Sequence, residues 1–225
     1  WHQGQRKAYA LNFREMAPRR AYAEMFLGAD GEVDRQKATR SLLSSGVPGT
    51  VAGLLEAQQR FGVLSRAEVM APAVALAHRG FPVYPELAAS LQQAMPLLAG
   101  DPNAKRLYYR AINKSVSNPA GYVAYRPGEI LRQPQLAATL RLISSQGAKA
   151  FYQGVIADQI DALMRSGGGL INRADLAAYG APWQEPVRGS FMGYTVLSMP
   201  PPSSGGVALV QLLNLLEPLN LGQMG

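Results

Sequence analysis

Cysteine is absent from the 225-residue chain, which excludes disulfide bonds, thiolate metal sites and a cysteine nucleophile within it. Histidine is nearly absent, because His2 and His78 are the only two and could not form a metal site without other ligands. No apolar run approaches the roughly 20 residues of a membrane span. No secretory leader is predicted in this segment either. The sequence therefore predicts no metal site and no membrane insertion in this segment.

Charged residues are also scarce, at 16%, whereas hydrophobic residues make up 48%, which is ample for a packed core. The net charge is +7, but the basic side chains are scattered and form no stripe with aromatic residues. Nucleic-acid binding is therefore not predicted. We expect residues 1–225 to form a single domain. Both ends read as cuts through a longer protein, so we expect an incomplete segment.

Hydrophobic periodicity, caps and turn residues predict a helix-rich middle with strands near both ends. Helices are expected at 18–27, 50–62, 66–78, 85–98, 134–145, 148–164, 172–179 and 205–216. Strands are expected at 7–13, 186–191 and 194–199, and residues 32–45 are expected to be loop. Residues 101–132 show no sustained period, apart from a short strand expected around 122–125. This distribution predicts an α+β fold.

The most constrained stretch is Pro200-Pro201-Pro202-Ser203-Ser204-Gly205-Gly206, between a predicted strand and a predicted helix. Its prolines stiffen the chain and remove N–H donors. Ser203 and Ser204 can cap the helix, while Gly205 and Gly206 allow backbone or ligand to come close. Such a polar turn at a strand end is typical of a binding site.

Arg14 lies at the end of the first predicted strand, and strand ends are where ligands are often bound. Its planar guanidinium could bind a carboxylate through two parallel hydrogen bonds. The alternative is an internal ion pair with Glu15, which is the commoner fate of an arginine.

The residues alone complete no catalytic constellation. Ser203 and Ser204 lack the Gly-x-Ser-x-Gly pattern of a nucleophile elbow, and His78 lies on an apolar helix, where a structural role is more common. Residues 46–53 lack the Gly-Lys-Ser/Thr ending of a phosphate loop, so nucleotide binding is not predicted. Their glycines are expected to permit a tight turn and close helix packing.

Five motifs occur in one order along the chain: Asn12-Phe13-Arg14-Glu15-Met16-Ala17-Pro18, Gly46-Val47-Pro48-Gly49-Thr50-Val51-Ala52-Gly53, Phe151-Tyr152-Gln153-Gly154, Asp175-Leu176-Ala177-Ala178-Tyr179 and the turn 200–206. Together they resemble the large subunit of the γ-glutamyltranspeptidase family, over nearly the whole chain. Members of that family are N-terminal-nucleophile hydrolases. The resemblance therefore implies part of a layered αββα sandwich, completed by a small subunit.

The resemblance also implies an activity. Such proteins are made as one inactive precursor, a zymogen, which cuts itself into a large and a small subunit that form a heterodimer. The new N-terminal threonine of the small subunit attacks the γ-glutamyl amide of glutathione or related compounds, and the acyl group passes to water, an amino acid or a peptide. Because the free α-amine serves as the base, no histidine is needed. No cofactor is implied.

By position, Arg14 matches the family arginine that binds the α-carboxylate of the glutamyl substrate. Possible site-lining residues are Glu15, Ser203, Ser204, Gly205 and Gly206. No catalytic residue is expected in this segment, which alone should be inactive, because none of its threonines, Thr39, Thr50, Thr139 and Thr195, lies in the nucleophile motif. Residues 110–124 resemble an insertion or a divergent loop relative to the family pattern.

Bacterial members of the family are commonly periplasmic and secreted, so a periplasmic or secreted location is expected. Two other functions stay open. One is a related enzyme of the same superfamily, such as a glutaryl- or cephalosporin-type acylase or a poly-γ-glutamate-processing enzyme. The other is a non-catalytic module that binds an amino-acid carboxylate through Arg14.

Overall fold

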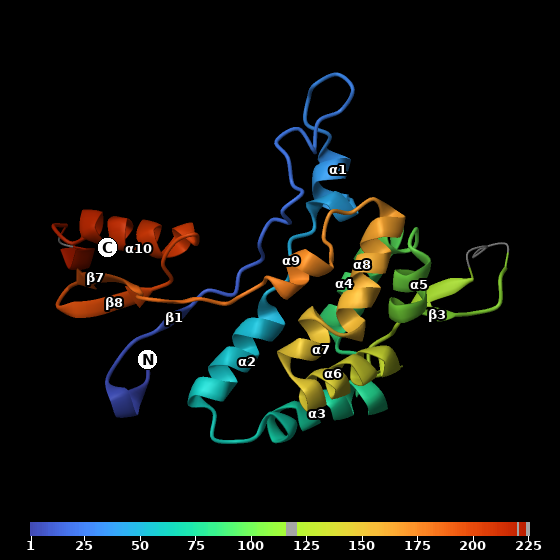
Figure 1. The fold of residues 1–225 in the computed structure, drawn as a ribbon, viewed down its shortest axis with the longest axis horizontal. Helices are drawn as coiled ribbons and strands as arrows, with labels where there is room; N and C mark the ends of the chain where they lie inside the picture. The colour runs from blue at the N-terminus through green and yellow to red at the C-terminus, as the bar shows by residue number, and fades with distance from the viewer. Residues whose placement is uncertain (116–120, 220, 224–225) are drawn as a thin grey trace. The chain divides into compact units, whose positions relative to one another are not determined.

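A computed structural model describes residues 1–115, 121–219 and 221–223 of the chain (Figure 1). The chain divides into two compact units, the first formed by Trp1–Gly62 with Phe151–Gly225 and the second by Val63–Ala150. The structure is α+β, helix-rich with small sheets, as the sequence predicts at this level. Within the described residues, no helix combines the length and the apolar character that crossing a bilayer requires.

The helices of the first unit are α1 (Arg35–Arg40), α2 (Thr50–Phe61), α8 (Val155–Gly167), α9 (Arg173–Ala177) and α10 (Ser204–Leu216), with short 3-10 turns η1 (Gln3–Gln5), η2 (Leu42–Ser44) and η3 (Leu221–Gln223). Its strands are β1 (Ala10–Leu11), β6 (Trp183–Gln184), β7 (Val187–Phe191) and β8 (Tyr194–Ser198). The second unit holds α3 (Arg66–Arg79), α4 (Pro85–Leu98), α5 (Pro102–Tyr108), α6 (Pro134–Gln146), β2 (Phe81–Pro82), β3 (Tyr109–Ala111), β4 (Tyr122–Ala124) and β5 (Ile130–Leu131). Helix α7 (Ala148–Tyr152) crosses the boundary between the two units in sequence.

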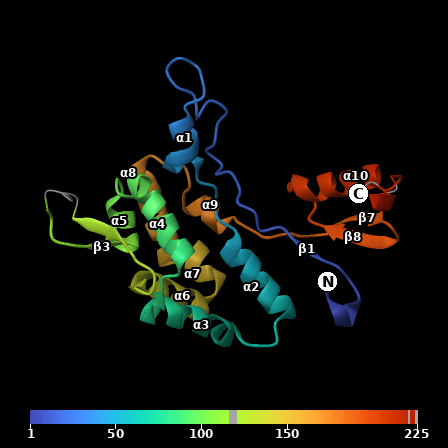
Figure 2. The ribbon, with the colours of Figure 1, turned by 180° about the vertical axis from the view of Figure 1, so that it is seen from behind.

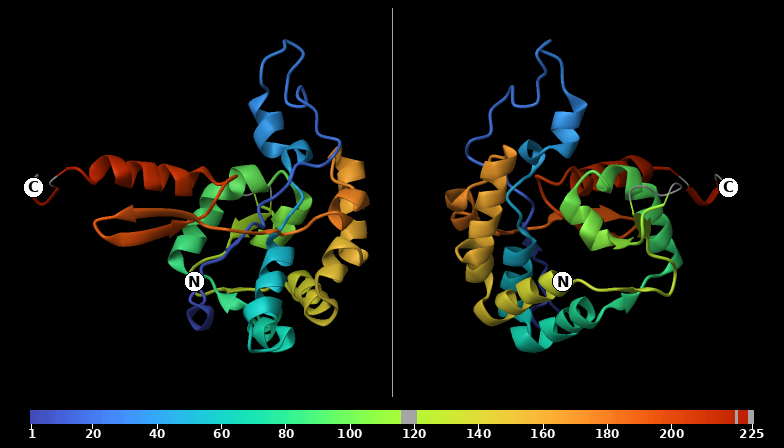
Figure 3. Two further views of the ribbon diagram at one scale, coloured as in Figure 1. Left: turned by 60° about the vertical axis from the view of Figure 1, so that its left-hand side comes forward. Right: turned by 90° about the vertical axis from the view of Figure 1, so that its right-hand side faces the viewer.

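All the sheets of the described residues are antiparallel pairs: β1 with β6, β2 with β5, β3 with β4, and β7 with β8. The hairpin β7–β8 turns at Met192 and Gly193, whose positive φ values of 48° and 82° suit a tight two-residue turn. Helix α10 lies along this hairpin, as Figures 2 and 3 show from different sides. In the second unit, α3 and α6 pack side by side.

Helices with clear terminal signals form where they are predicted. Ser65 and Glu68 make a reciprocal capping box at the start of α3, in which the Glu68 carboxylate accepts the Ser65 N–H at 2.8 Å. Asn172 and Asp175 form the equivalent box before α9. Gly168 ends α8 in the left-handed conformation, with φ of 75°. These local hydrogen bonds explain why the helix starts are readable from sequence.

Three predictions of helix and loop positions are wrong. Residues 18–27 form separate turns rather than a helix, because the backbone hydrogen bonds between residues of this stretch join positions three apart, as in Ala21 N–H to the Pro18 carbonyl at 2.9 Å. Residues 32–45, predicted as loop, contain α1, whose N-cap Asp34 accepts the Lys37 N–H at 3.0 Å. The predicted helix 148–164 is broken between α7 and α8, where Gly154 adopts an extended conformation.

The stretch 101–132 is also more ordered than predicted. Helix α5 begins after Asp101, whose carboxylate accepts the Ala104 N–H at 2.7 Å. The strand expected near 122–125 is confirmed as β4 and pairs with β3. Of the divergent segment 110–124, residues 116–120 lie outside the described residues.

Candidate functional site

Arg14 lies three residues beyond β1, which is shorter than the predicted strand 7–13 because ladder pairing with β6 covers only Ala10 and Leu11. After the strand, the Arg14 N–H donates to Asn12 Oδ1 at 3.2 Å, so a local turn sets the direction of the chain. The Arg14 side chain is thereby carried out of the sheet and is 55% exposed.

A cavity of about 370 Å³ surrounds this strand end. Leu11 to Glu15 line it, together with Met199, Pro200, Pro202 and Ser203 of the turn that follows β8. Thr50, the first residue of α2, completes the lining. Among the predicted site residues, the structure thus brings Arg14, Glu15 and Ser203 to one cavity.

Arg14 pairs with its neighbour Glu15, with 3.4 Å between Nε and the carboxylate Oε1. Both side chains are mostly exposed, at 55% and 61%, so the pair contributes little stability. Among the described residues Glu15 is the one ion-pair partner of the guanidinium, which keeps further N–H groups for a ligand. A carboxylate entering the cavity could therefore displace Glu15 at small cost.

The turn 200–206 differs in part from the prediction. Ser203 occupies the N-cap position of α10, but its side chain makes no capping hydrogen bond, and Ser204 is the exposed first residue of the helix. Contrary to the prediction, neither serine therefore caps the helix with its side chain. The turn is closed instead by a backbone hydrogen bond from the Ser203 N–H to the Pro200 carbonyl at 3.2 Å. The Ser203 hydroxyl and the first-turn N–H groups of α10 stay available to a ligand.

The two glycines of this turn have different surroundings. A side chain on Gly206 would collide with the Met199 carbonyl and would come within 3.0 Å of the Ser198 hydroxyl, so a glycine is needed where α10 meets the end of β8. Gly205 is exposed, and a Cβ atom added to it would have the Ser203 hydroxyl as its nearest neighbour, at 3.9 Å. Neither glycine lines the cavity.

Two stacked tyrosines hold the backbone behind the cavity. The Tyr179 hydroxyl donates to the Arg14 carbonyl at 2.8 Å. The Tyr152 hydroxyl donates to the Pro48 carbonyl at 2.7 Å and accepts the Ala52 N–H at 3.2 Å. The two rings stack with centroids 5.5 Å apart and planes 9° from parallel. Residues far apart in sequence are thus joined at the strand end that carries Arg14.

The glycines of 46–53 allow this close approach, as predicted. A side chain on Gly49 would overlap both the Tyr179 hydroxyl and the Phe13 carbonyl. A side chain on Gly53 would overlap the Phe13 ring. The motifs that stand apart in the sequence therefore meet in the structure, around the backbone of residues 13 and 14.

Burial raises the pKa of Tyr152 to about 12, and burial together with the Glu15 carboxylate raises the pKa of Tyr179. Replacing Tyr152 by Phe leaves the Pro48 carbonyl and the Ala52 N–H without their partner. We therefore expect the free energy of unfolding to fall by about 1–3 kcal/mol at neutral pH. A tyrosine whose pKa is raised on folding stabilises the folded state, and this contribution is complete below the pKa of about 10 that the group has in the unfolded chain. The difference in the free energy of unfolding between the wild type and Tyr152→Phe should therefore become smaller as pH rises from about 10 to about 12.

Thermal unfolding of the complete protein and of its Tyr152→Phe variant, at neutral pH and at pH about 11, measures this difference. A difference in Tm that does not shrink at the alkaline pH would contradict the buried, neutral state of the Tyr152 hydroxyl.

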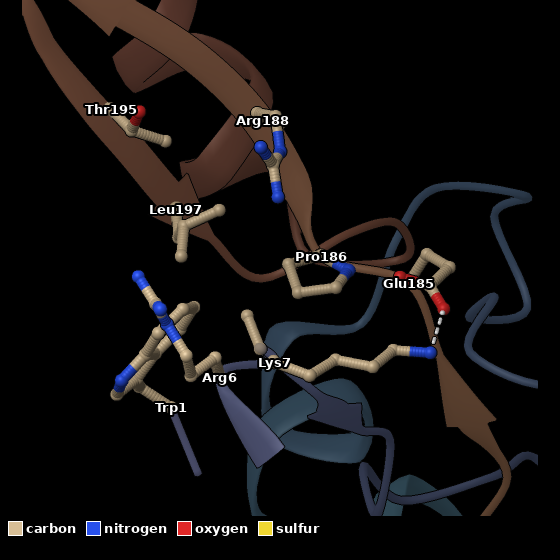
Figure 4. A pocket seen from close by; sticks show the side chains of 9 residues that line it. Trp1, Arg6, Lys7, Glu185, Pro186, Arg188, Thr195 and Leu197 are labelled. Carbon is tan, nitrogen blue, oxygen red and sulfur yellow. Dashed lines mark ion pairs between the residues drawn. The ribbon is translucent and has the colours of Figure 1, made fainter. Parts of the chain in front are cut away.

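A second cavity, of about 400 Å³, lies between the N-terminal turn and the β7–β8 hairpin (Figure 4). Arg6 and Arg188 line it, and Lys7 is neutralised there by Glu185 at 3.2 Å. Its lining in the described structure includes none of the predicted site residues. Arg188 is therefore a matched control for Arg14, as an exposed arginine in the same unit at another cavity.

Sequence reasoning missed several residues of this site. Thr50 lines the cavity, and Tyr152 and Tyr179 fix the backbone behind it. The two tyrosines belong to two of the five motifs that resemble the family, 151–154 and 175–179, and this was the one indication of them in the sequence. Their partners lie 104 and 165 residues away along the chain, so no local pattern reveals the contacts.

The family model described as "Gamma-glutamyltranspeptidase" matches residues 1–225. The chain is 41% identical over 217 residues to the glutathione hydrolase proenzyme of Escherichia coli K12, covering 96% of this chain and 36% of that protein. It is 39% identical over 215 residues to the Acylase ACY 1 proenzyme of Pseudomonas sp. strain SE83, covering 93% of this chain and 37% of that protein.

Among solved structures, the γ-glutamyltranspeptidase of Helicobacter pylori matches with a TM-score of 0.93 and 36% identity, over 100% of this chain and 62% of that chain. The chain thus spans little more than a third of the length of the two proenzymes. With the family model matched from end to end, the chain belongs to the γ-glutamyltranspeptidase family.

Proposed function

We propose that the complete protein is a γ-glutamyltransferase and glutathione hydrolase, and that residues 1–225 are part of its large subunit. The observation that carries this proposal is Arg14, with free guanidinium N–H groups, in a cavity bounded by family motifs. The relatives named glutathione hydrolase proenzymes support the same activity. The proposed substrates are γ-glutamyl amides such as glutathione.

Arg14 would bind the α-carboxylate of the donor through parallel N–H···O bonds. The incoming carboxylate replaces Glu15 on the guanidinium, exchanging one exposed ion pair for a charge-assisted contact inside the cavity. Ser203, which lines the same cavity, can donate its hydroxyl to the same ligand. The donor's acidic end would thus be fixed while its γ-amide extends toward the nucleophile.

The nucleophile would be an N-terminal threonine of a small subunit cut from the same precursor. Its hydroxyl oxygen forms a bond to the γ-carbonyl carbon as its proton passes to the α-amine, and the C–N bond of the amide then breaks as the leaving amine takes up a proton. Water, an amino acid or a peptide next attacks the resulting ester and releases the threonine. In this scheme the large subunit contributes substrate binding and no covalent step.

The same proposal covers the finer architecture. Residues 1–225 would form a single domain within an αββα sandwich completed by the small subunit, and the two subunits would form a heterodimer made by autoprocessing. A periplasmic or secreted location accords with the bacterial relatives. These points rest on the family relationship rather than on the described residues.

A glutaryl- or cephalosporin-type acylase is the second candidate, because the Acylase ACY 1 proenzyme is 39% identical to this chain. A glutaryl group is a γ-glutamyl group without its α-amine, so both donors present a carboxylate to Arg14. The α-amine is therefore the group that distinguishes a substrate of one enzyme from a substrate of the other. A 4-aminobutanoyl group keeps the amine and lacks the carboxylate, so it tests the contact between the carboxylate and Arg14 alone.

Assaying the complete, processed protein with γ-glutamyl, glutaryl and 4-aminobutanoyl 4-nitroanilides tests these functions. We expect the γ-glutamyl anilide to have the highest kcat/KM. A higher value for the glutaryl anilide would favour the acylase. Binding of glutamate without turnover of any anilide would favour the non-catalytic carboxylate-binding module and would contradict the proposal.

A further inference from the structure

The loop that follows Arg14 is held at both ends by the segment around helix α9. At one end, the Tyr179 hydroxyl donates to the Arg14 carbonyl at 2.8 Å. At the other, the buried Asp175 carboxylate accepts the Arg19 N–H at 3.0 Å. Figure 1 shows α9 beside this part of the N-terminal segment. The backbone that carries the guanidinium is therefore fixed by residues about 160 positions away.

Tyr179 is itself held in place. Its ring stacks on Tyr152, whose hydroxyl is bonded to both Pro48 and Ala52, and Gly49 leaves the space that the Tyr179 hydroxyl occupies. Burial and the Glu15 carboxylate raise the pKa of Tyr179, so the hydroxyl keeps the proton that it donates. A rigid donor at a fixed position can define where the Arg14 backbone lies.

We propose that Tyr179 is a positioning residue for Arg14, acting through the Arg14 carbonyl to aim the guanidinium at the carboxylate of the acyl donor. This inference rests on the proposed function, because it presumes that Arg14 binds the donor. Tyr179 does not line the cavity and is not expected to touch substrate. Its contribution is to reduce the freedom of the strand end, so that little order must be gained when the donor binds.

The test is Tyr179→Phe in the complete, processed protein, which removes the hydroxyl and keeps the stacked ring. We expect KM for γ-glutamyl 4-nitroanilide to rise about threefold to tenfold, as loss of one hydrogen bond allows, with kcat changed less than about twofold. We expect kcat/KM for the 4-aminobutanoyl anilide to stay within about twofold, because that donor has no carboxylate to misplace.

Tyr109→Phe is the matched control. Tyr109 is a buried tyrosine whose hydroxyl donates to the Leu91 carbonyl at 2.8 Å, so its removal costs a hydrogen bond of the same kind in the other unit. The control should lower Tm while leaving KM unchanged. Placing 4-aminophenylalanine at position 179 restores a donor at similar reach and should return KM to within about twofold of the wild type.

The outcomes separate this inference from the proposed function. If Arg14→Ala raises KM but Tyr179→Phe behaves like Tyr109→Phe, the positioning role is wrong and the function of Arg14 stands. If Tyr179→Phe lowers kcat/KM equally for both anilides, the role is general stability and the inference is overturned. If neither Arg14→Ala nor Tyr179→Phe changes KM, the proposed carboxylate contact fails, and the inference fails with it.

Discussion

Replacing Arg14 by Ala in the complete protein should raise KM for γ-glutamyl 4-nitroanilide about 30-fold to 1,000-fold, which corresponds to a loss of roughly 2–4 kcal/mol of binding. The reason is the loss of a charge-assisted contact to the donor carboxylate. The cavity offers no second cation, since Arg14 is the one basic residue among its described lining residues. The backbone at position 14 should keep its conformation in the variant, because the Tyr179 hydroxyl donates to the main-chain carbonyl of this residue, which Ala retains.

Arg188→Ala is the control for this substitution, as an exposed arginine that lines the other cavity. It should leave KM unchanged, so that a general loss of positive charge is excluded. Arg14→Lys should recover part of the affinity, because an ammonium keeps the charge but cannot form the two parallel bonds. An unchanged KM in Arg14→Ala would remove Arg14 from the donor site.

Replacing Gly49 by Ala should lower the free energy of unfolding by about 3 kcal/mol or more. The added methyl group would occupy the space of the Tyr179 hydroxyl and of the Phe13 carbonyl. The carbonyl belongs to the backbone of the strand end and cannot rotate away as a flexible side chain would. Either α2 or the strand end must therefore shift, and the Tyr179 contact to Arg14 is lost with it.

Gly180→Ala is the matched control, because a side chain at that nearby position would meet nothing within 4 Å. Thermal unfolding of the complete protein measures both variants, and only Gly49→Ala should show a large fall in Tm. A Tm for Gly49→Ala within the range of Gly180→Ala would contradict the close packing of the 46–53 segment against Phe13 and Tyr179.

The elements that could be predicted from the sequence are those with local chemistry at their ends. The Ser65–Glu68 and Asn172–Asp175 boxes each complete their hydrogen bonds within four residues, and the β7–β8 hairpin turns at a glycine with positive φ. Residues 18–27 were wrongly predicted as a helix because a proline start and a glycine end do not ensure bonds between residues four apart.

The site could be predicted only in part. The Arg14 position and the turn 200–206 were predicted from their residue types and the family resemblance. The structure places Arg14 at one cavity with Pro200, Pro202 and Ser203 of that turn. The contacts that hold these residues in place could not be predicted from the sequence. A bond between Tyr179 and a carbonyl 165 residues earlier leaves no periodic trace, and the overlap that requires Gly49 exists only once three separate segments have packed together.

The most direct test of the account is a crystal structure of the complete protein with L-glutamate bound. We expect two guanidinium nitrogens of Arg14 to lie about 2.7–2.9 Å from the α-carboxylate oxygens, with Glu15 displaced from its present pairing and the Tyr179 bond to the Arg14 carbonyl retained. A ligand carboxylate bound by other residues, with Arg14 still paired to Glu15, would contradict the account.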